Sequence, residues 1–198
     1  MIDALLRELQ ATGPVEMLGV GLGYVYVLLI YRRSRLGWIA GGASSIAFVY
    51  LAARARLPMQ SVLNLYYVIM SVYGWRNWTR SEQQEAGGIT RWPWRYHAAT
   101  VLALLIASVL LAQLLRRQAL AALPFLDSMT TCVSLFATWS LARLQLENWL
   151  YWMWADSVTA YMFGSQGYPL ASAMYLSYLV IAVLGFRAWL RRYRHQLA

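Results

Sequence analysis

The chain has 198 residues, of which 60% are hydrophobic and only 13% are charged, and its mean hydropathy is +0.45. Soluble domains average about 45–50% apolar and about 25% charged residues, and a soluble core of this size leaves much of the chain's surface in water. The composition therefore argues against a soluble globular domain and against a disordered chain. It predicts an all-α integral membrane protein.

The formal net charge is +9, and all 17 basic residues are arginines. They occur in short clusters between long apolar runs, which is typical of membrane loops rather than of a basic face for nucleic acid. Cys132 is the only cysteine and the chain has two histidines. We therefore expect no intrachain disulfide, no metal site and no cofactor.

In chain order, residues 1–14 carry acidic residues and a weak amphipathic face, which predicts a short interfacial helix rather than a signal peptide. Segments long enough to cross a bilayer follow, since a spanning helix needs about 20 mostly apolar residues. These seven segments are residues 15–31, 36–53, 58–75, 97–115, 126–142, 147–164 and 169–190. They are too long, and alternate too little, to be strands. We expect the polar stretch 76–96 to be a solvated connector.

Seven crossings place the two termini on opposite sides of the membrane. Twelve of the arginines then fall on the side of the C-terminus and five on the other side. Because cytoplasmic loops carry the excess of basic residues, the N-terminus of this multi-pass protein is expected outside and the C-terminus in the cytoplasm.

The chain also aligns with itself, without a gap, at an offset of 111 residues. Paired positions include Trp38 with Trp149, Pro58 with Pro169, Tyr67 with Tyr178, Gly74 with Gly185, and Trp78 with Trp189. In both copies a proline opens a helix and a Gly-x-Arg-x-Trp motif closes one. Four crossings separate equivalent helices, so both copies insert in the same orientation. The pattern predicts a parallel repeat of three helices, a linker helix and three helices.

This repeat divides the chain into five parts. They are the N-terminal segment 1–14, the first repeat 15–78, the loop and linker helix 79–125, the second repeat 126–192 and the cytoplasmic tail 193–198. Transporters with two matching halves bind their cargo between the halves, near the middle of the membrane. The alternative is an old duplication that serves only as a scaffold.

Asp156 is the most informative polar residue within an apolar segment. It lies nine residues after Glu147, which places it about 14 Å along the helix and near the middle of a hydrocarbon core about 30 Å thick. A carboxylate there costs at least about 2.5 kcal/mol on insertion scales, so such residues usually face a cavity or a partner. The alternatives are a structural ion pair or a protonated packing residue.

Trp149 and Trp152 share a helical face with Asp156, and Thr159 continues the same stripe. Two indole rings beside one carboxylate suit a flat cationic ligand, because the rings provide stacking and cation–π attraction and the carboxylate provides a counter-charge. The alternative is a tryptophan at the membrane interface, which fits Trp149 better than Trp152.

A polar stripe runs along the third segment at spacings of four, three and four residues. It consists of Gln60, Asn64, Tyr67 and Ser71. Such a stripe either lines a binding cavity or joins helices by hydrogen bonds. The repeat pairs Asn64 and Tyr67 with Tyr175 and Tyr178, so the two halves offer unequal chemistry, as an asymmetric ligand requires.

Glu16 and Asp127 occupy matching positions at the outer ends of the first and fifth segments. Acidic side chains stabilise the positive end of a helix dipole. We therefore expect these two residues to favour helix starts rather than to bind a ligand.

Several stretches resemble the PnuC family of vitamin transporters, and the likeness covers about residues 15–192. The stretches are Asn64 to Trp78, with its Tyr-Gly-Trp-x-x-Trp motif, Glu147 to Trp152, with Asn-Trp-x-x-Trp, and Gly185 to Trp189. The resemblance implies a three-plus-one-plus-three fold similar to the SWEET sugar transporters. It also implies facilitated uptake of nicotinamide riboside, trapping by cytoplasmic phosphorylation, and a homotrimer in the lipid bilayer.

In this family the Trp-x-x-Trp pair lines the substrate site, which carries over to Trp149 and Trp152, and the polar position four residues later carries over to Asp156. Many members that transport nicotinamide riboside have Asn there, whereas relatives that import thiamine or other vitamins can have Asp. Since nicotinamide riboside and thiamine are both flat cations, Asp156 does not choose between them.

The resulting candidate substrate-binding residues are Gln60, Asn64, Tyr67, Trp149, Trp152, Asp156 and Tyr175. The leading hypothesis is a passive vitamin transporter, for nicotinamide riboside or alternatively thiamine. An enzyme that uses Asp156 as an acid or base is less favoured, because it lacks a second carboxylate, a histidine or a nucleophile at the same depth. A membrane scaffold without cargo is the third hypothesis.

Overall fold

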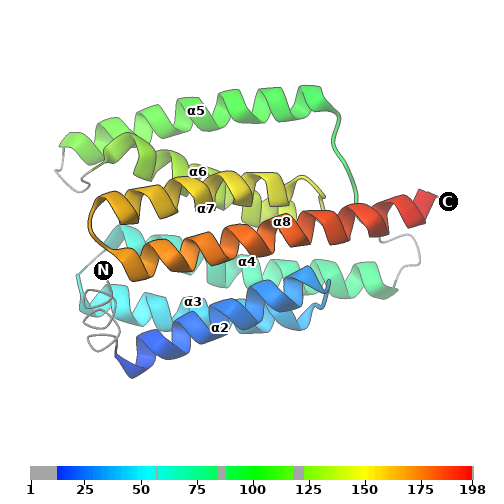
Figure 1. Cartoon of the computed structure of the whole chain (residues 1–198), viewed down its shortest axis with the longest axis horizontal. Coiled ribbons are helices and arrows are strands. Elements are labelled where there is room, and N and C mark those ends of the chain that lie inside the picture. Colours follow the sequence, from blue (N-terminus) through cyan, green and yellow to red (C-terminus); the bar gives the residue numbers. More distant parts are fainter. Residues whose placement is uncertain (1–12, 57, 84–87, 118–122, 198) are drawn as a thin grey trace.

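The computed structural model describes residues 13–56, 58–83, 88–117 and 123–197, which form seven long helices that run along one common direction (Figure 1). They are α2 (Pro14–Tyr31), α3 (Leu36–Arg54), α4 (Pro58–Gln83), α5 (Trp94–Arg117), α6 (Pro124–Ala142), α7 (Asn148–Ser165) and α8 (Pro169–Leu197). The predicted interfacial helix lies, up to residue 12, outside the described residues.

Proline opens α2, α4, α6 and α8, as expected for a residue whose missing N–H and fixed φ suit the first turn of a helix. Two helices continue beyond the predicted membrane segments, which end at residues 75 and 190, because α4 extends to Gln83 and α8 to Leu197. Hydropathy detects the part of a helix that suits the bilayer, and both helices continue beyond it with charged turns. Residues 76–83 are therefore helical rather than part of a connector.

Neighbouring helices pack in two groups. Helix α3 contacts α2 and α4, and α7 contacts α6 and α8, while the contacts α4–α6 and α2–α8 join the groups. Among the described helices, α5 packs mainly against α6, touches α7 through the hydrogen bond between His97 and Tyr151, and runs along one edge of the molecule (Figure 1). Its face away from α6 exposes apolar side chains such as Leu102, Ile106 and Leu110, which suits contact with lipid or with another membrane helix.

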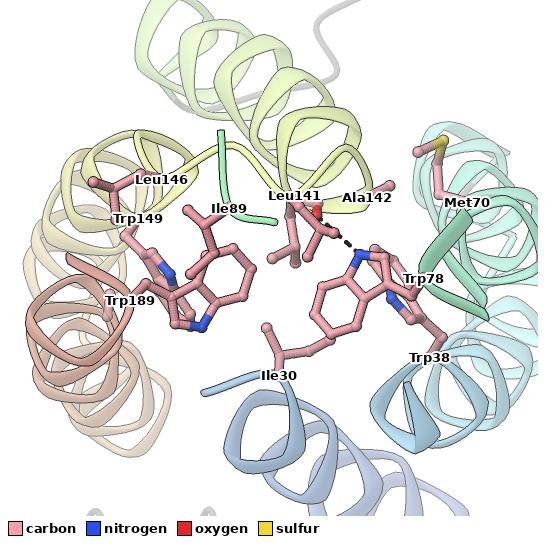
Figure 2. Packing of buried hydrophobic residues seen from close by; sticks show 12 residues of the cluster. Ile30, Trp38, Met70, Trp78, Ile89, Leu141, Ala142, Leu146, Trp149 and Trp189 are labelled. Carbon is pink, nitrogen blue, oxygen red and sulfur yellow. Dashed lines mark hydrogen bonds between the residues drawn. The ribbon is translucent and has the colours of Figure 1, made fainter. Parts of the chain in front are cut away.

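Four tryptophans dominate the buried core, and the 111-residue offset relates them in pairs (Figure 2). Trp38 meets Trp78 edge to face with centroids 5.6 Å apart, and Trp149 meets Trp189 in the same way at 5.6 Å. The rings of Trp78 and Trp189 lie 5.9 Å apart and connect the two pairs. The same contact therefore occurs at both copies of the sequence repeat.

Two glycines make this packing possible. A Cβ atom at Gly74 would overlap the indole of Trp38, and one at Gly185 would lie 2.6 Å from the indole of Trp149. Both glycines are needed for close approach of a helix to a ring and not for an unusual backbone conformation. Their equivalence explains why the Gly-x-Arg-x-Trp motif occurs in both halves.

Four described helices, α2, α3, α5 and α8, are long and apolar enough to span a membrane. The other three, α4, α6 and α7, fall short of that composition although they have 26, 19 and 18 residues. Their amides, hydroxyls and carboxylates lower their hydropathy, and many of these groups line the cavity described next.

Candidate functional site

A cavity of about 1170 Å³ lies between the two helix groups. Its described lining comes from α2, α3, α4, α6, α7 and α8, with no residue from α5. All seven sequence-predicted site residues lie on this lining: Gln60, Asn64, Tyr67, Trp149, Trp152, Asp156 and Tyr175. The structure thus brings together residues that are up to 115 positions apart in the chain.

The cavity is open at one end and closed at the other. Its open end is bordered by the first turns of α2 and α4 and by the turn before α8, where Met17, Gln60 and Tyr168 are exposed. Its floor consists of buried side chains, each at most 2% exposed: Ile30, Trp38, Leu141, Trp149 and Ala182. The floor lies toward the arginine-rich end of the molecule, where the loops 32–35 and 143–147 and the end of α8 gather (Figure 1).

Asp156 is 6% exposed and lines the cavity from α7. No hydrogen bond or ion pair recorded between described residues involves its carboxylate, whereas it interacts electrostatically with the phenols of Tyr175 and Tyr178 on α8. The structural ion pair considered from the sequence is therefore not formed within the described part of the chain. An unpaired carboxylate at a cavity wall is suited to binding a cation.

The two predicted tryptophans differ in their surroundings. Trp152 is partly buried and lines the cavity one turn before Asp156. Trp149 is 2% exposed, packs on Gly185 and Trp189, and its indole N–H has no hydrogen-bond partner. Trp152 therefore has ring surface at the cavity wall, while Trp149 forms part of the cavity floor.

The polar stripe on α4 faces the same cavity. Asn64 is 6% exposed and donates its amide to the carbonyl of Gln60 at 2.9 Å, which leaves the Asn64 side-chain oxygen available. Tyr67 and Ser71 also line the cavity, and the hydroxyl of Ser71 donates to the carbonyl of Val68 in its own helix. The stripe thus lines the cavity, while the neighbouring Tyr66, whose hydroxyl donates to the carbonyl of Leu135 at 2.8 Å, joins α4 to α6.

Tyrosines from α8 and α2 complete the lining. Tyr175 stacks on Phe163 with ring centroids 5.6 Å apart and planes 7° apart, and Tyr178 lies 4.9 Å from Tyr24. The hydroxyl of Tyr24 is hydrogen-bonded to Ser177 at 2.7 Å. These contacts connect α2 with α8 beside the cavity and hold the tyrosine rings in place.

A stripe of hydroxyls on α6 also lines the cavity and was missed in the sequence analysis. It consists of Thr130, Ser134 and Thr138, at a spacing of four, with Thr131 beside them. The hydroxyls of Thr130 and Thr138 donate to carbonyls of the preceding turn, so burying them in an apolar helix costs little free energy. Their helical spacing is the signal that identifies them.

Charge on the described lining has one sign. Glu16 and Asp127 lie in the first turns of α2 and α6, at the positive ends of the helix dipoles, and both also line the cavity. Together with Asp156 they give three carboxyl groups. No arginine, lysine or histidine is among the described lining residues, so the cavity favours positively charged solutes.

The family model described as nicotinamide mononucleotide transporter matches residues 13–191. The chain belongs to this family. It is 25% identical to the riboflavin/roseoflavin transporter RibM of Streptomyces davaonensis over 183 residues, which cover 90% of this chain and 85% of that protein. It is 24% identical to the nicotinamide riboside transporter PnuC of Escherichia coli over 208 residues, covering 92% and 87%.

A solved structure, the crystal structure of the vitamin B3 transporter PnuC, matches the fold of this chain with a TM-score of 0.76 at 20% sequence identity. The match covers 98% of this chain and 88% of that one. The predicted resemblance to the PnuC family is thereby confirmed. The family and its structural neighbour are transporters and not enzymes.

Proposed function

We propose that the chain takes up nicotinamide riboside across the bacterial inner membrane by facilitated diffusion, with metabolic trapping inside the cell. The observation that carries this proposal is the unpaired carboxylate of Asp156, beside the ring of Trp152, in a cavity whose described charged residues are all acidic. A pyridinium ring stacked on Trp152 brings its positive charge next to Asp156.

Binding of a cation compensates the cost of the buried carboxylate. A charge pair about 4 Å apart contributes about 4 kcal/mol at an effective dielectric constant of about 20, and cation–π attraction adds up to about 2 kcal/mol when the ring is desolvated. The amide and hydroxyl groups on α4 and α6, together with Tyr175, face the other parts of the solute. We propose Gln60, Asn64, Tyr67 and Tyr175 as its polar contacts, above a floor that includes Trp149.

The charges on the cavity lining support some of the possible cargoes better than others. A mononucleotide carries a phosphate, and no cationic side chain among the described lining residues would compensate it. Riboflavin is uncharged and would leave Asp156 unpaired. Thiamine is cationic and aromatic, so it remains the alternative cargo. These charges support a nucleoside-like cation as cargo over a nucleotide or a flavin.

The wider architecture is proposed on the same basis. Repeated packing of the tryptophan pairs supports a parallel three-plus-one-plus-three repeat with α5 as linker, seven crossings and the parts 1–14, 15–78, 79–125, 126–192 and 193–198. The gathering of arginine-containing loops at the end where α8 terminates supports a cytoplasmic C-terminus and an outside N-terminus. Family resemblance supports a homotrimer.

The test is ligand binding by the purified full chain, followed by uptake into proteoliposomes. Ligand that binds the folded state raises its melting temperature, so nicotinamide riboside, thiamine, riboflavin and nicotinamide mononucleotide are compared by thermal shift. We expect the first to stabilise the protein and to accumulate in the vesicles unchanged. Stabilisation by riboflavin or by the mononucleotide alone would refute the proposal.

A further inference from the structure

We propose that residues 88–91, called the strap, form a lid that closes the arginine-rich end of the cavity. The strap has to move away from this position before the cargo can pass. This inference rests on the proposed transport path through the cavity. These residues fall within the predicted solvated connector, but Ile89 is 3% exposed and belongs to the buried tryptophan cluster.

The strap pairs with the loop between α6 and α7 through its backbone. The N–H of Thr90 donates to the carbonyl of Leu144 at 3.0 Å, and the N–H of Leu146 donates to the carbonyl of Thr90 at 2.9 Å. Leu144 adopts a φ of 57°, a left-handed conformation that is uncommon for a residue with a side chain. The loop thus adopts an uncommon backbone conformation at Leu144, the residue whose carbonyl pairs with the strap.

An ion pair continues this attachment to the start of α7. The guanidinium Nε of Arg91 lies 2.7 Å from Oε1 of Glu147, and the Glu147 side chain is 6% exposed. Glu147 immediately precedes α7, the helix that carries Trp152 and Asp156. The strap is therefore connected to the helix that bears the central residues of the candidate site.

The end of α8 holds the strap from another direction. The side chain of Gln196 accepts a hydrogen bond from the N–H of Ile89 at 3.1 Å and directs its amide toward the carbonyl of Ile89 at 3.5 Å. Gln196 lies in the part of α8 that extends beyond the predicted membrane segment. In the described structure this extension of α8 therefore contacts the strap, whereas a solvated tail would have no such partner.

The position of Ile89 relates the strap to the cavity floor. Figure 2 shows its side chain beside Leu141 and next to Trp149 and Trp189. Leu141 and Trp149 are floor residues of the cavity. The Ile89 side chain lies against the floor on the side away from the cavity, so it blocks any passage that opens through the floor. Opening at this end therefore requires the strap to move, and its noncovalent attachments allow it to do so.

The experiment locks the strap shut. Cysteines replace Gly88 and Gln196 in a Cys132→Ala background, and a short bifunctional thiol reagent with a reducible linkage joins them. A Cβ atom at Gly88 would lie 2.9 Å from the Cδ position of Gln196, so the pair is close enough to bridge. We expect the linked protein to lose uptake of nicotinamide riboside more than tenfold and to regain it after reduction. Binding at the open end should change less than twofold.

Controls separate locking from damage and from a wrong cargo. Each single-cysteine variant is compared with itself before and after the same reagent, and its uptake should not change on treatment, because no link forms. If the unlinked protein moves thiamine or riboflavin instead, that vitamin replaces nicotinamide riboside, so a wrong substrate is recognised before the reagent is added. Unchanged uptake by the fully linked protein would overturn the proposal and show that the strap is a fixed brace.

Discussion

Replacing Asp156 by Asn should weaken the binding of cationic cargo far more than that of an uncharged analogue. The side chains are almost isosteric, so the change removes the charge and keeps the volume. A cation about 4 Å from a carboxylate gains about 4 kcal/mol at an effective dielectric constant of about 20. Because the cavity is open at one end, solvent reduces this to about 2–4 kcal/mol. The expected loss of affinity is about 30- to 1000-fold.

The matched ligands are nicotinamide riboside and its reduced, uncharged dihydro form, which have nearly the same shape. Calorimetry on the purified full chain gives both dissociation constants for the wild type and for Asp156→Asn. Asp127→Asn is the control variant, since this carboxyl group also lines the cavity but lies in the first turn of α6. We expect the control to lose less than fivefold for either ligand.

Folding is checked in the same samples. Asp156 has no ion-pair partner among the described residues, so removal of its charge should leave the melting temperature of the unliganded protein unchanged or higher. An equal loss of affinity for the charged and the uncharged ligand would refute the counter-ion role. Asp156 would then be a structural or gating residue.

Three other substitutions test other parts of the account. Trp152→Ala should weaken binding of nicotinamide riboside by calorimetry at least tenfold, because it removes stacking and cation–π attraction, and an unchanged affinity would contradict its role as a ligand ring. Gly185→Ala forces a methyl group into the neighbouring indole and should cost about 1–3 kcal/mol, seen as a lower melting temperature, whereas Gly21→Ala, which meets nothing within 4 Å, should not. His195→Cys in a Cys132→Ala background should resist impermeant thiol reagents in intact cells, and ready labelling would reverse the proposed orientation.

Much of the fold was predictable because a membrane helix is recognisable in the sequence as a long apolar stretch. Prolines and arginine clusters mark the boundaries, and six of the seven predicted helix starts lie within two residues of the observed ones. The exception is α5, which begins at Trp94, three residues before the predicted start. Helix ends outside the membrane were harder to predict, as α4 shows. Hydropathy marks the end of the apolar stretch, whereas the helix itself continues with charged turns.

The site was predictable where polar residues interrupt an apolar helix. Asp156 and the α4 stripe stood out for this reason, and both line the cavity. Thr138 and its neighbours did not stand out, because a hydroxyl bonded to its own helix is common in membranes. Sequence spacing also could not show that Trp149 packs against Gly185, nor that Ile89 reaches Gln196, because these contacts join distant segments.

The most direct test of the central claim is exchange transport in proteoliposomes that contain only the purified chain. Vesicles loaded with unlabelled nicotinamide riboside should accumulate labelled nicotinamide riboside without an ion gradient or ATP, and excess thiamine should compete more strongly than riboflavin or nicotinamide mononucleotide. Accumulation driven only by an imposed gradient would contradict facilitated diffusion. Exchange of riboflavin or of the mononucleotide, with none of nicotinamide riboside, would contradict the assignment of a cation-selective cavity.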